Sequence, residues 1–249
     1  CGVKKEKEAD SELPKIVIGM DYFEPYSYQA SDGEYKGIDV ELAKEAFQRL
    51  GYQPKFENIV WEDKDELLAD GTVDCLWSSY SMNGREDKYQ WAGPYLYSRQ
   101  MVVVKNESEI QTLSDLKGKR IAVQATTKAE DLFLHNIKSD LPQMQQVNCF
   151  STTNEIYAAL RKSYVDAIAG HEAMLGSLVK EGKDAYRMLD ESIYKSELGV
   201  AFKKGTHEEV AADLTETLKK LQREGITEKI VTKYGLDADE ILPEGEQNE

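Results

Sequence analysis

The chain has 249 residues, of which 46 are acidic and 31 are basic, so its formal net charge is −15 at pH 7. A chain of this length can hold one large domain or two modest ones, each with a full hydrophobic core. The negative charge argues against a nucleic-acid groove, because such a groove needs a basic stripe to displace counterions. No apolar run approaches the length that spans a bilayer.

Residues 1–13 differ from the rest of the chain in composition. Cys1 and Gly2 precede a charged run with almost no apolar residues. This pattern resembles the amino terminus of a mature bacterial lipoprotein, which acyl groups on the cysteine anchor to a membrane. We therefore expect a lipidated Cys1 and a polar tether over 1–13, the alternative being an arbitrary start of the numbering.

Strands and helices then alternate along the first part of the chain. Residues 15–20 are predicted to form a buried strand, which leads into an aromatic loop at 21–28. A helix is expected over 39–50, because its apolar residues recur at helical spacing and Gly51 follows. A strand, a short helix and a strand are predicted at 56–61, 65–69 and 73–77. This order predicts a doubly wound α/β unit.

Hydroxyl side chains follow the last of these strands. Ser78, Ser79 and Ser81 come directly after the apolar residues 75–77, and Arg85 follows a few positions later. Ligands of open α/β sheets bind at the carboxyl ends of the strands. A guanidinium matches a carboxylate with two parallel hydrogen bonds. The segment therefore predicts a small-anion site, the alternative being a solvated surface cluster around Arg85.

The same alternation continues along the rest of the chain. Strands are predicted at 101–104, 120–124, 147–150, 165–169 and 198–202, with a helical turn at 113–118 and helices at 129–137, 154–161 and 208–224. The segment LADGTVDCL at 68–76 is echoed at the same spacing by LRKSYVDAI at 160–168. Unless this echo is a coincidence, it predicts two similar lobes with a cleft between them, a favoured place for a small-molecule site. The tail from Asp237 is expected to be a surface cap or a frayed end.

Cysteine, histidine and motif patterns give no sign of an enzyme. Cys75 and Cys149 lie inside predicted strands and form no CxxC pair, so we expect two buried apolar side chains and no structural disulfide. His135, His171 and His207 are scattered and make no metal-ligand pattern. Nothing matches GxSxG, HExxH, a Walker loop or GxGxxG. We therefore expect neither a metal nor a cofactor.

The order and spacing of these segments resemble the extracytoplasmic substrate-binding proteins of polar amino-acid ABC transporters, which have the type II periplasmic binding fold. The landmarks lie between positions 14 and 236 and are Gly19-x-Asp21, Phe23-x-Pro25-Tyr26, Gly37-Ile-Asp39-Val-Glu-Leu-Ala43, Gly71-x-Val-Asp74, Ser81 to Arg85, Gly93-Pro-Tyr95, Asp115-Leu-Lys-Gly118, Val165-Asp166-Ala and Leu198-Gly-Val-Ala-Phe. The resemblance implies two doubly wound α/β lobes joined by a two-strand hinge, with lobe 1 at 14–101 and 198–249 and lobe 2 at 102–197. Ligand would be trapped by closure of the hinge.

The resemblance also implies which residues contact the ligand. An arginine and hydroxyl residues would hold its carboxylate, aromatic rings would pack on its carbon skeleton, and an aspartate would meet its side chain. These residues are Asp21, Phe23, Trp61, Ser79, Ser81, Arg85, Thr126, Thr127 and His171.

His171 departs from the family pattern. Many members have an acidic residue here that binds the ligand α-ammonium, and a neutral imidazole is a weaker partner for a cation. Either Glu172 substitutes for it, or the ligand lacks an ordinary α-amino group, or His171 is an exposed turn residue. If His171 meets the ligand, its titration near pH 6.5 would change the affinity.

The resemblance implies a monomeric lipoprotein that captures a small polar ligand, best matched by an amino acid, and delivers it outside the cytoplasm to an ABC transporter permease. No nucleic-acid partner is expected. One alternative is a cyclic-acid dehydratase-like enzyme on the same fold, with His171 and Glu172 as acid–base groups. The other is the ligand-sensing module of a receptor.

Overall fold

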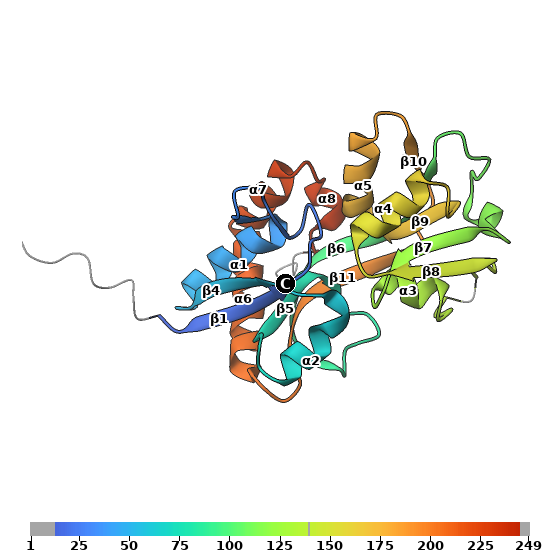
Figure 1. Ribbon diagram of the computed structural model, residues 1–249. Coiled ribbons are helices and arrows are strands. Elements are labelled where there is room, and N and C mark those ends of the chain that lie inside the picture. Colours follow the sequence, from blue (N-terminus) through green and yellow to red (C-terminus); the bar gives the residue numbers. More distant parts are fainter. Residues whose placement is uncertain (1–12, 139, 245–249) are drawn as a thin grey trace, which may run out of the picture.

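The computed structural model describes residues 13–138 and 140–244, so Cys1 and nearly all of the predicted tether lie outside the described residues. A nine-stranded sheet has the order β4-β1-β5-β11-β6-β9-β7-β8, with β10 beside β6 (Figure 1). β2 and β3 pair in a separate two-stranded sheet. The strands are β1 (Lys15–Met20), β2 (Tyr28–Gln29), β3 (Tyr35–Lys36), β4 (Gln53–Asn58), β5 (Cys75–Ser81), β6 (Tyr89–Lys105), β7 (Arg120–Gln124), β8 (Gln146–Phe150), β9 (Ala167–His171), β10 (Tyr186–Met188) and β11 (Tyr194–Lys203).

Helices connect these strands and cover the sheet. The α-helices are α1 (Ile38–Arg49), α2 (Lys64–Ala69), α3 (Lys128–Phe133), α4 (Thr153–Arg161), α5 (Glu172–Glu181), α6 (Glu208–Arg223), α7 (Ile226–Lys233) and α8 (Ala238–Ile241). Two 3₁₀ turns are η1 (Trp61–Asp63) and η2 (Leu113–Leu116).

The sheet is divided between two lobes (Figure 1). In lobe 1, β1 pairs in parallel with β4 on one side and β5 on the other. In lobe 2, β7 pairs in parallel with β8 and β9 in the same way. The long strands β6 and β11 are antiparallel and run between the lobes. The predicted fold class, two α/β lobes joined by a two-strand hinge, is therefore confirmed.

The echoed segments occupy equivalent places in the two lobes. The Asp74 carboxylate accepts the N–H of Val17 at 2.7 Å, and the Asp74 N–H donates to the Val17 carbonyl at 2.8 Å. Asp166 makes the same two contacts with Arg120, each at 2.9 Å. Each aspartate precedes the strand that leads towards the cleft and fixes it against the central strand of its lobe. The sequence echo is therefore structural.

In the carboxyl-terminal segment, helix α6 packs against helix α1. Ala211, Leu214, Leu218 and Leu221 form the buried face of the amphipathic helix α6. This face packs into the same hydrophobic cluster as the buried face of α1. Apolar burial of this kind is the main stabilising contribution to such a fold.

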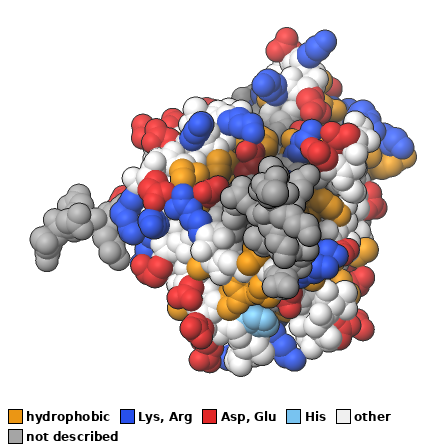
Figure 2. All heavy atoms as spheres, turned by 90° about the vertical axis from the view of Figure 1, so that its left-hand side faces the viewer, with side chains coloured by type: hydrophobic (Ala, Val, Ile, Leu, Met, Phe, Trp, Pro, Cys, Tyr) orange, Lys and Arg blue, Asp and Glu red, His pale blue; other side chains and the backbone are white. Residues whose placement is uncertain are grey.

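The surface carries charges of both signs. On the face shown in Figure 2, acidic and basic side chains are interspersed, and the described residues form no continuous basic stripe there. Arg49 illustrates the mixing, because it pairs with Glu45 on α1 and with Glu224 after α6. Within the described ranges, none of the helices has the length and apolar character that crossing a membrane requires.

Some predicted boundaries are wrong near the cleft. The strand predicted at 73–77 is β5, which runs to Ser81, because antiparallel pairing with β11 extends it through the serines. Trp61 opens η1 instead of ending a strand, since β4 stops at Asn58. The strand predicted at 101–104 is the end of β6, which begins at Tyr89.

Other corrections concern the lobe surfaces. The helix predicted at 129–137 ends at Phe133, and α5, β10 and α7 were not predicted. Residues Ala238–Ile241 of the tail form α8, which is docked through the buried Ile241, so this described part fits the predicted surface cap and not a frayed end. Cys75 is buried as expected, but Cys149 is exposed, because β8 is the edge strand of the sheet and has one open side.

The twin aspartates are expected to stabilise the two lobes to a similar extent. Asp74→Ala and Asp166→Ala each leave a backbone N–H without its acceptor, so each should lower the free energy of unfolding by about 1–3 kcal/mol. Urea denaturation of the two variants measures this loss. Glu216→Ala, which removes an exposed carboxylate paired with Lys219 on the surface, is the control and should stay within about 0.5 kcal/mol of the wild type. Equal stabilities of all four proteins would contradict the assignment.

Candidate functional site

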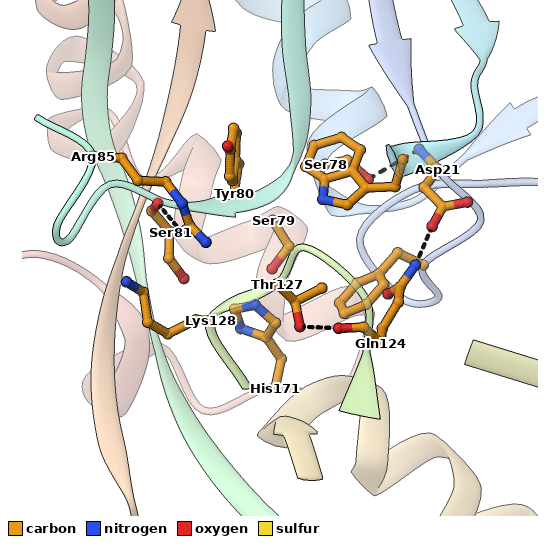
Figure 3. Close-up of a pocket in the computed structure, with 12 residues that line it drawn as sticks. Asp21, Ser78, Ser79, Tyr80, Ser81, Arg85, Gln124, Thr127, Lys128 and His171 are labelled. Carbon is orange, nitrogen blue, oxygen red and sulfur yellow. Dashed lines mark hydrogen bonds between the residues drawn. The ribbon is translucent and has the colours of Figure 1, made fainter. Parts of the chain in front are cut away.

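Twelve residues from both lobes line a cavity between the lobes (Figure 3). They are Asp21, Phe23, Trp61, Ser78, Ser79, Tyr80, Ser81, Arg85, Gln124, Thr127, Lys128 and His171. The set contains every ligand-contact residue that the sequence predicted except Thr126. The lining residues lie at or just beyond the carboxyl ends of β1, β4, β5, β7 and β9, so the site lies where the ends of these strands meet.

The wall from lobe 1 contains two hydroxyl groups without partners. The Oγ atoms of Ser79 and Ser81 are buried, and neither has a described partner at hydrogen-bonding distance and angle. The buried Tyr26 hydroxyl interacts only weakly with Ser79. Buried polar atoms normally have a partner, so an exception needs an explanation. Ser79 also has φ 50°, in the left-handed region that a side chain disfavours. Strained residues of this kind cluster at functional sites.

A buried carboxylate behind the wall holds Ser79 in place. Asp39 accepts the N–H of Ser79 at 2.7 Å and the hydroxyl proton of Tyr95 at 2.7 Å. Burial raises the pKa of Asp39 to about 7, and the two hydrogen bonds oppose that rise. Asp39 does not line the cavity, so its effect on the site acts through the position of Ser79.

Arg85 is fixed by contacts with both lobes. One terminal nitrogen donates to the Ser81 carbonyl at 2.9 Å, and the other donates to Asp131 of lobe 2 at 2.9 Å. The guanidinium lies 5.0 Å from the centre of the Tyr80 ring. A guanidinium has five N–H donors, so these contacts leave donors for a ligand.

Lys128 adds a second cation beside Arg85 (Figure 3). Its Nζ lies 3.4 Å from the same Asp131 carboxylate and donates to the carbonyl of Asn83 in lobe 1. Lys128 is only 3 % exposed, and burial together with the nearby charge of Arg85 lowers its pKa. One carboxylate of the protein is therefore shared between two cations.

The wall from lobe 2 reaches the opposite end of the cavity. Gln124 donates through Nε2 to Asp21 of lobe 1 at 2.6 Å and to the carbonyl of Ser151 at 3.0 Å. The hydroxyl of Thr127 donates to the Gln124 carbonyl at 2.7 Å, so the Thr127 hydroxyl proton is already used in a hydrogen bond within lobe 2. Thr126, at φ 59°, does not line the cavity, because the left-handed turn that brings Thr127 into the wall directs Thr126 elsewhere.

His171 is buried in the cavity wall and is not an exposed turn residue. Its Nδ1 lies 2.7 Å from the Ser98 hydroxyl, and its ring meets the Phe23 ring edge-on at 5.5 Å. Burial, and to a lesser extent the charge of Arg85, lowers the pKa of His171 to about 3. His171 therefore stays neutral across pH 5.5–8, and the expectation that it titrates near pH 6.5 is wrong.

Glu172 does not replace the missing acidic residue. It forms a two-point ion pair with Arg99, with distances of 2.9 and 2.6 Å. It lines a different hollow of about 740 Å³ and not the cavity that contains His171. Glu172 is therefore no substitute for an acidic residue at position 171, and the two side chains do not form an acid–base pair facing one cavity.

Three lining residues were not predicted: Tyr80, Gln124 and Lys128. Ser78 was named in the predicted anion-site segment but not among the ligand contacts. Two of the three were detectable, because Tyr80 is next to Ser79, and Gln124 ends a strand that was predicted with the correct boundaries. Lys128 carried no signal, since a lysine at a helix start is normally on the surface. Among the described residues, no cluster of His, Cys, Asp or Glu side chains is arranged to hold a metal ion.

Comparison with known proteins places the chain in a family. Residues 16–237 match the family described as bacterial extracellular solute-binding proteins, family 3, and the chain belongs to this family. The L-cystine-binding protein TcyJ of Escherichia coli K12 is 26% identical over 223 residues, which cover 88% of this chain and 82% of the relative. The histidine-binding periplasmic protein of Salmonella typhimurium is 27% identical over 232 residues, with coverage of 88% and 87%.

Solved structures agree with this placement. An ABC uptake transporter substrate-binding protein from Streptococcus pneumoniae with bound histidine has a TM-score of 0.81 at 26% identity, over 90% of this chain and 93% of that one. The ancestral amino-acid-binding protein AncCDT-1, described as a precursor of cyclohexadienyl dehydratase, has a TM-score of 0.78 at 25% identity, over 88% and 95%.

His171 is expected to make the fold sensitive to acid. The unfolded chain binds a proton at this residue as the pH falls through about 6.5, whereas the folded chain does not until about pH 3. Stability is therefore lost as the pH falls through this window, by about 2 kcal/mol between pH 7 and pH 5. Urea denaturation at both pH values should show a smaller loss for His171→Gln than for the wild type.

The exposed His135 supplies the control for this measurement. His135→Gln should keep the pH dependence of the wild type. Asp39, whose pKa is raised in the folded protein, changes the stability with pH in the opposite direction. Because Asp39 is present in all three proteins, comparing their pH profiles removes its contribution. Parallel pH profiles for His171→Gln and the wild type would show that His171 titrates normally in the folded protein.

Proposed function

We propose that this protein captures an amino acid between its two lobes and delivers it to an ABC transporter permease on the extracytoplasmic side of a bacterial membrane. The observation that carries the proposal is the pair of buried, unpartnered hydroxyls of Ser79 and Ser81 next to Arg85 in the interlobe cavity. Relatives named for binding cystine and histidine support it.

The geometry suits a ligand carboxylate. Arg85 has N–H donors that its protein partners do not use, and the Ser79 and Ser81 hydroxyls can donate to the same group. Phe23 and Trp61 line the cavity and can pack on the carbon skeleton of the ligand. The predicted roles of these residues are thus part of the proposal.

Binding requires the lobes to part. The cavity has a volume of about 20 Å³, which is room for about one water molecule. Ligand sites for small molecules are generally several hundred Å³ in volume. We infer rotation about β6 and β11, which are the continuous link between lobes with predicted boundaries at 102 and 198.

The alternative functions receive less support. The acid–base pair suggested for a dehydratase is not assembled, because Glu172 is paired with Arg99 outside the cavity. The likeness to AncCDT-1 concerns a protein described as amino-acid-binding. The lipid anchor at Cys1 and the monomeric state rest on the sequence and stay predictions.

Arg85→Ala should weaken amino-acid binding by about 2–5 kcal/mol, because it removes one partner of a charge pair that closure desolvates. Calorimetry against the tightest binder from the standard amino acids plus L-cystine measures the change. An affinity within twofold of the wild type would refute the role.

Two control variants separate the possible causes of a loss. Asp131→Asn removes the interlobe ion pair of Arg85 but keeps the guanidinium, so it should lose much less affinity than Arg85→Ala. Arg49→Ala removes a surface arginine outside the cavity and should bind like the wild type. An equal loss of affinity in Asp131→Asn and Arg85→Ala would mean that the Arg85–Asp131 ion pair, and not contact between Arg85 and the ligand, supports binding.

A further inference from the structure

The charges around the cavity constrain the charge of the ligand. Lobe 2 presents no free carboxylate to the cavity, because His171 is neutral and Glu172 is paired with Arg99 in another hollow. Two more acids lie near the cavity on this side, but neither lines it: Asp131 is held by Arg85 and Lys128, and Glu130 accepts the N–H of Thr126. A cationic group of the ligand therefore finds no partner in lobe 2.

Asp21 is the one carboxylate among the twelve lining residues. Its oxygens accept the Gln124 amide at 2.6 Å and the Tyr22 N–H at 2.8 Å, and no described residue forms an ion pair with it. Burial raises its pKa, which these hydrogen bonds oppose. A partly buried carboxylate held only by neutral donors is stabilised when a cation comes next to it.

The opposite end of the cavity has an excess of positive charge. Arg85 and Lys128 carry two positive charges, and among the described residues Asp131 is the one carboxylate that forms an ion pair with either of them. The exposed Glu86 attracts both cations from farther away, where solvent screens its charge, so a net positive charge is left at this end. Lys64 is also buried, but its Nζ lies over the Trp61 and Tyr80 rings, outside the cavity lining. Figure 3 shows Arg85 and Lys128 at one end and Asp21 at the other.

Resting on the proposed function, we propose that the ligand is an amino acid with an uncharged side chain, and that Asp21 of lobe 1 binds its ammonium group. One ligand carboxylate balances the excess at Arg85 and Lys128, and one ammonium balances Asp21. Asp21 thereby takes the task that position 171 does not perform in this chain.

A charged side chain would upset this balance. A second cation on the ligand would be desolvated on closure without an acidic partner, and a second carboxylate would face Asp21 or compete with Asp131 for the same cations. Leaving a buried charge unpaired is costly, so the site discriminates by repulsion as well as by attraction.

Pairs of ligands with similar shape and different charge test the inference on the wild-type protein. L-Citrulline differs from L-arginine, and L-glutamine from L-glutamate, mainly in side-chain charge. Calorimetry with these four compounds and the remaining standard amino acids should give at least tenfold tighter binding for the uncharged member of each pair that binds measurably. Tighter binding of arginine or glutamate than of its uncharged counterpart would overturn the inference and leave the proposed function standing.

Asp21→Asn tests the residue itself. This variant keeps an oxygen that can accept from Gln124, and it should bind the tightest uncharged amino acid at least tenfold more weakly than the wild type. Asp32→Asn changes an exposed carboxylate outside the cavity and should leave the affinity unchanged. Unchanged binding in Asp21→Asn would remove Asp21 from the site. If no amino acid binds to the wild type at all, the proposed function fails and the inference fails with it.

Discussion

β6 and β11 are hydrogen-bonded to each other from the Gln100–Tyr194 pair to the Tyr89–Lys203 pair, and the strands of both lobes are attached to this ladder. β5 joins it through β11, which places Ser81 beside Leu198. β9 joins it through β6, which places His171 beside Gln100. Leu198 is itself opposite Leu96, so the two strand ends are four positions apart along β6, or about 13 Å at the rise of a strand. The site exists because this register points two strand ends at each other.

Hydrogen bonds behind the carboxyl end of β5 hold the lobe 1 wall of the cavity in place. Ser79 adopts a left-handed conformation inside a strand, which costs on the order of 1–3 kcal/mol. The Asp39 carboxylate offsets this cost by accepting the Ser79 N–H, and the Tyr95 hydroxyl fixes the carboxylate in turn. The hydrophobic core that surrounds these groups makes their hydrogen bonds stronger and the loss of any one of them more costly.

The sequence predicts the boundaries of strands that depend mainly on a local apolar pattern. It fails where pairing with a neighbouring strand sets the boundary. β1 and β7 have the predicted boundaries, whereas β5 extends through its serines only because β11 lies alongside. The sequence alone does not show that His171 is buried, because Ser98 and Phe23, which enclose it, come from distant segments of the chain. The resemblance identified most of the cavity lining but not the balance of charge, because that balance depends on Asp131, whose contacts with Arg85 and Lys128 exist only in the folded lobes.

On the proposed function, closure of the lobes and capture of a ligand would involve the same side chains. Arg85 meets Asp131 and Asp21 meets Gln124 across the cleft, so each group already has a partner in the other lobe when the cavity is small. A ligand can shift the opening equilibrium only by its differential affinity for the two states. Contacts that merely replace a protein partner contribute little to that difference. Contacts with groups that the protein leaves unsatisfied contribute most, and in this cavity those are the hydroxyls of Ser79 and Ser81, the unused N–H donors of Arg85 and the charge of Asp21, which only neutral donors meet.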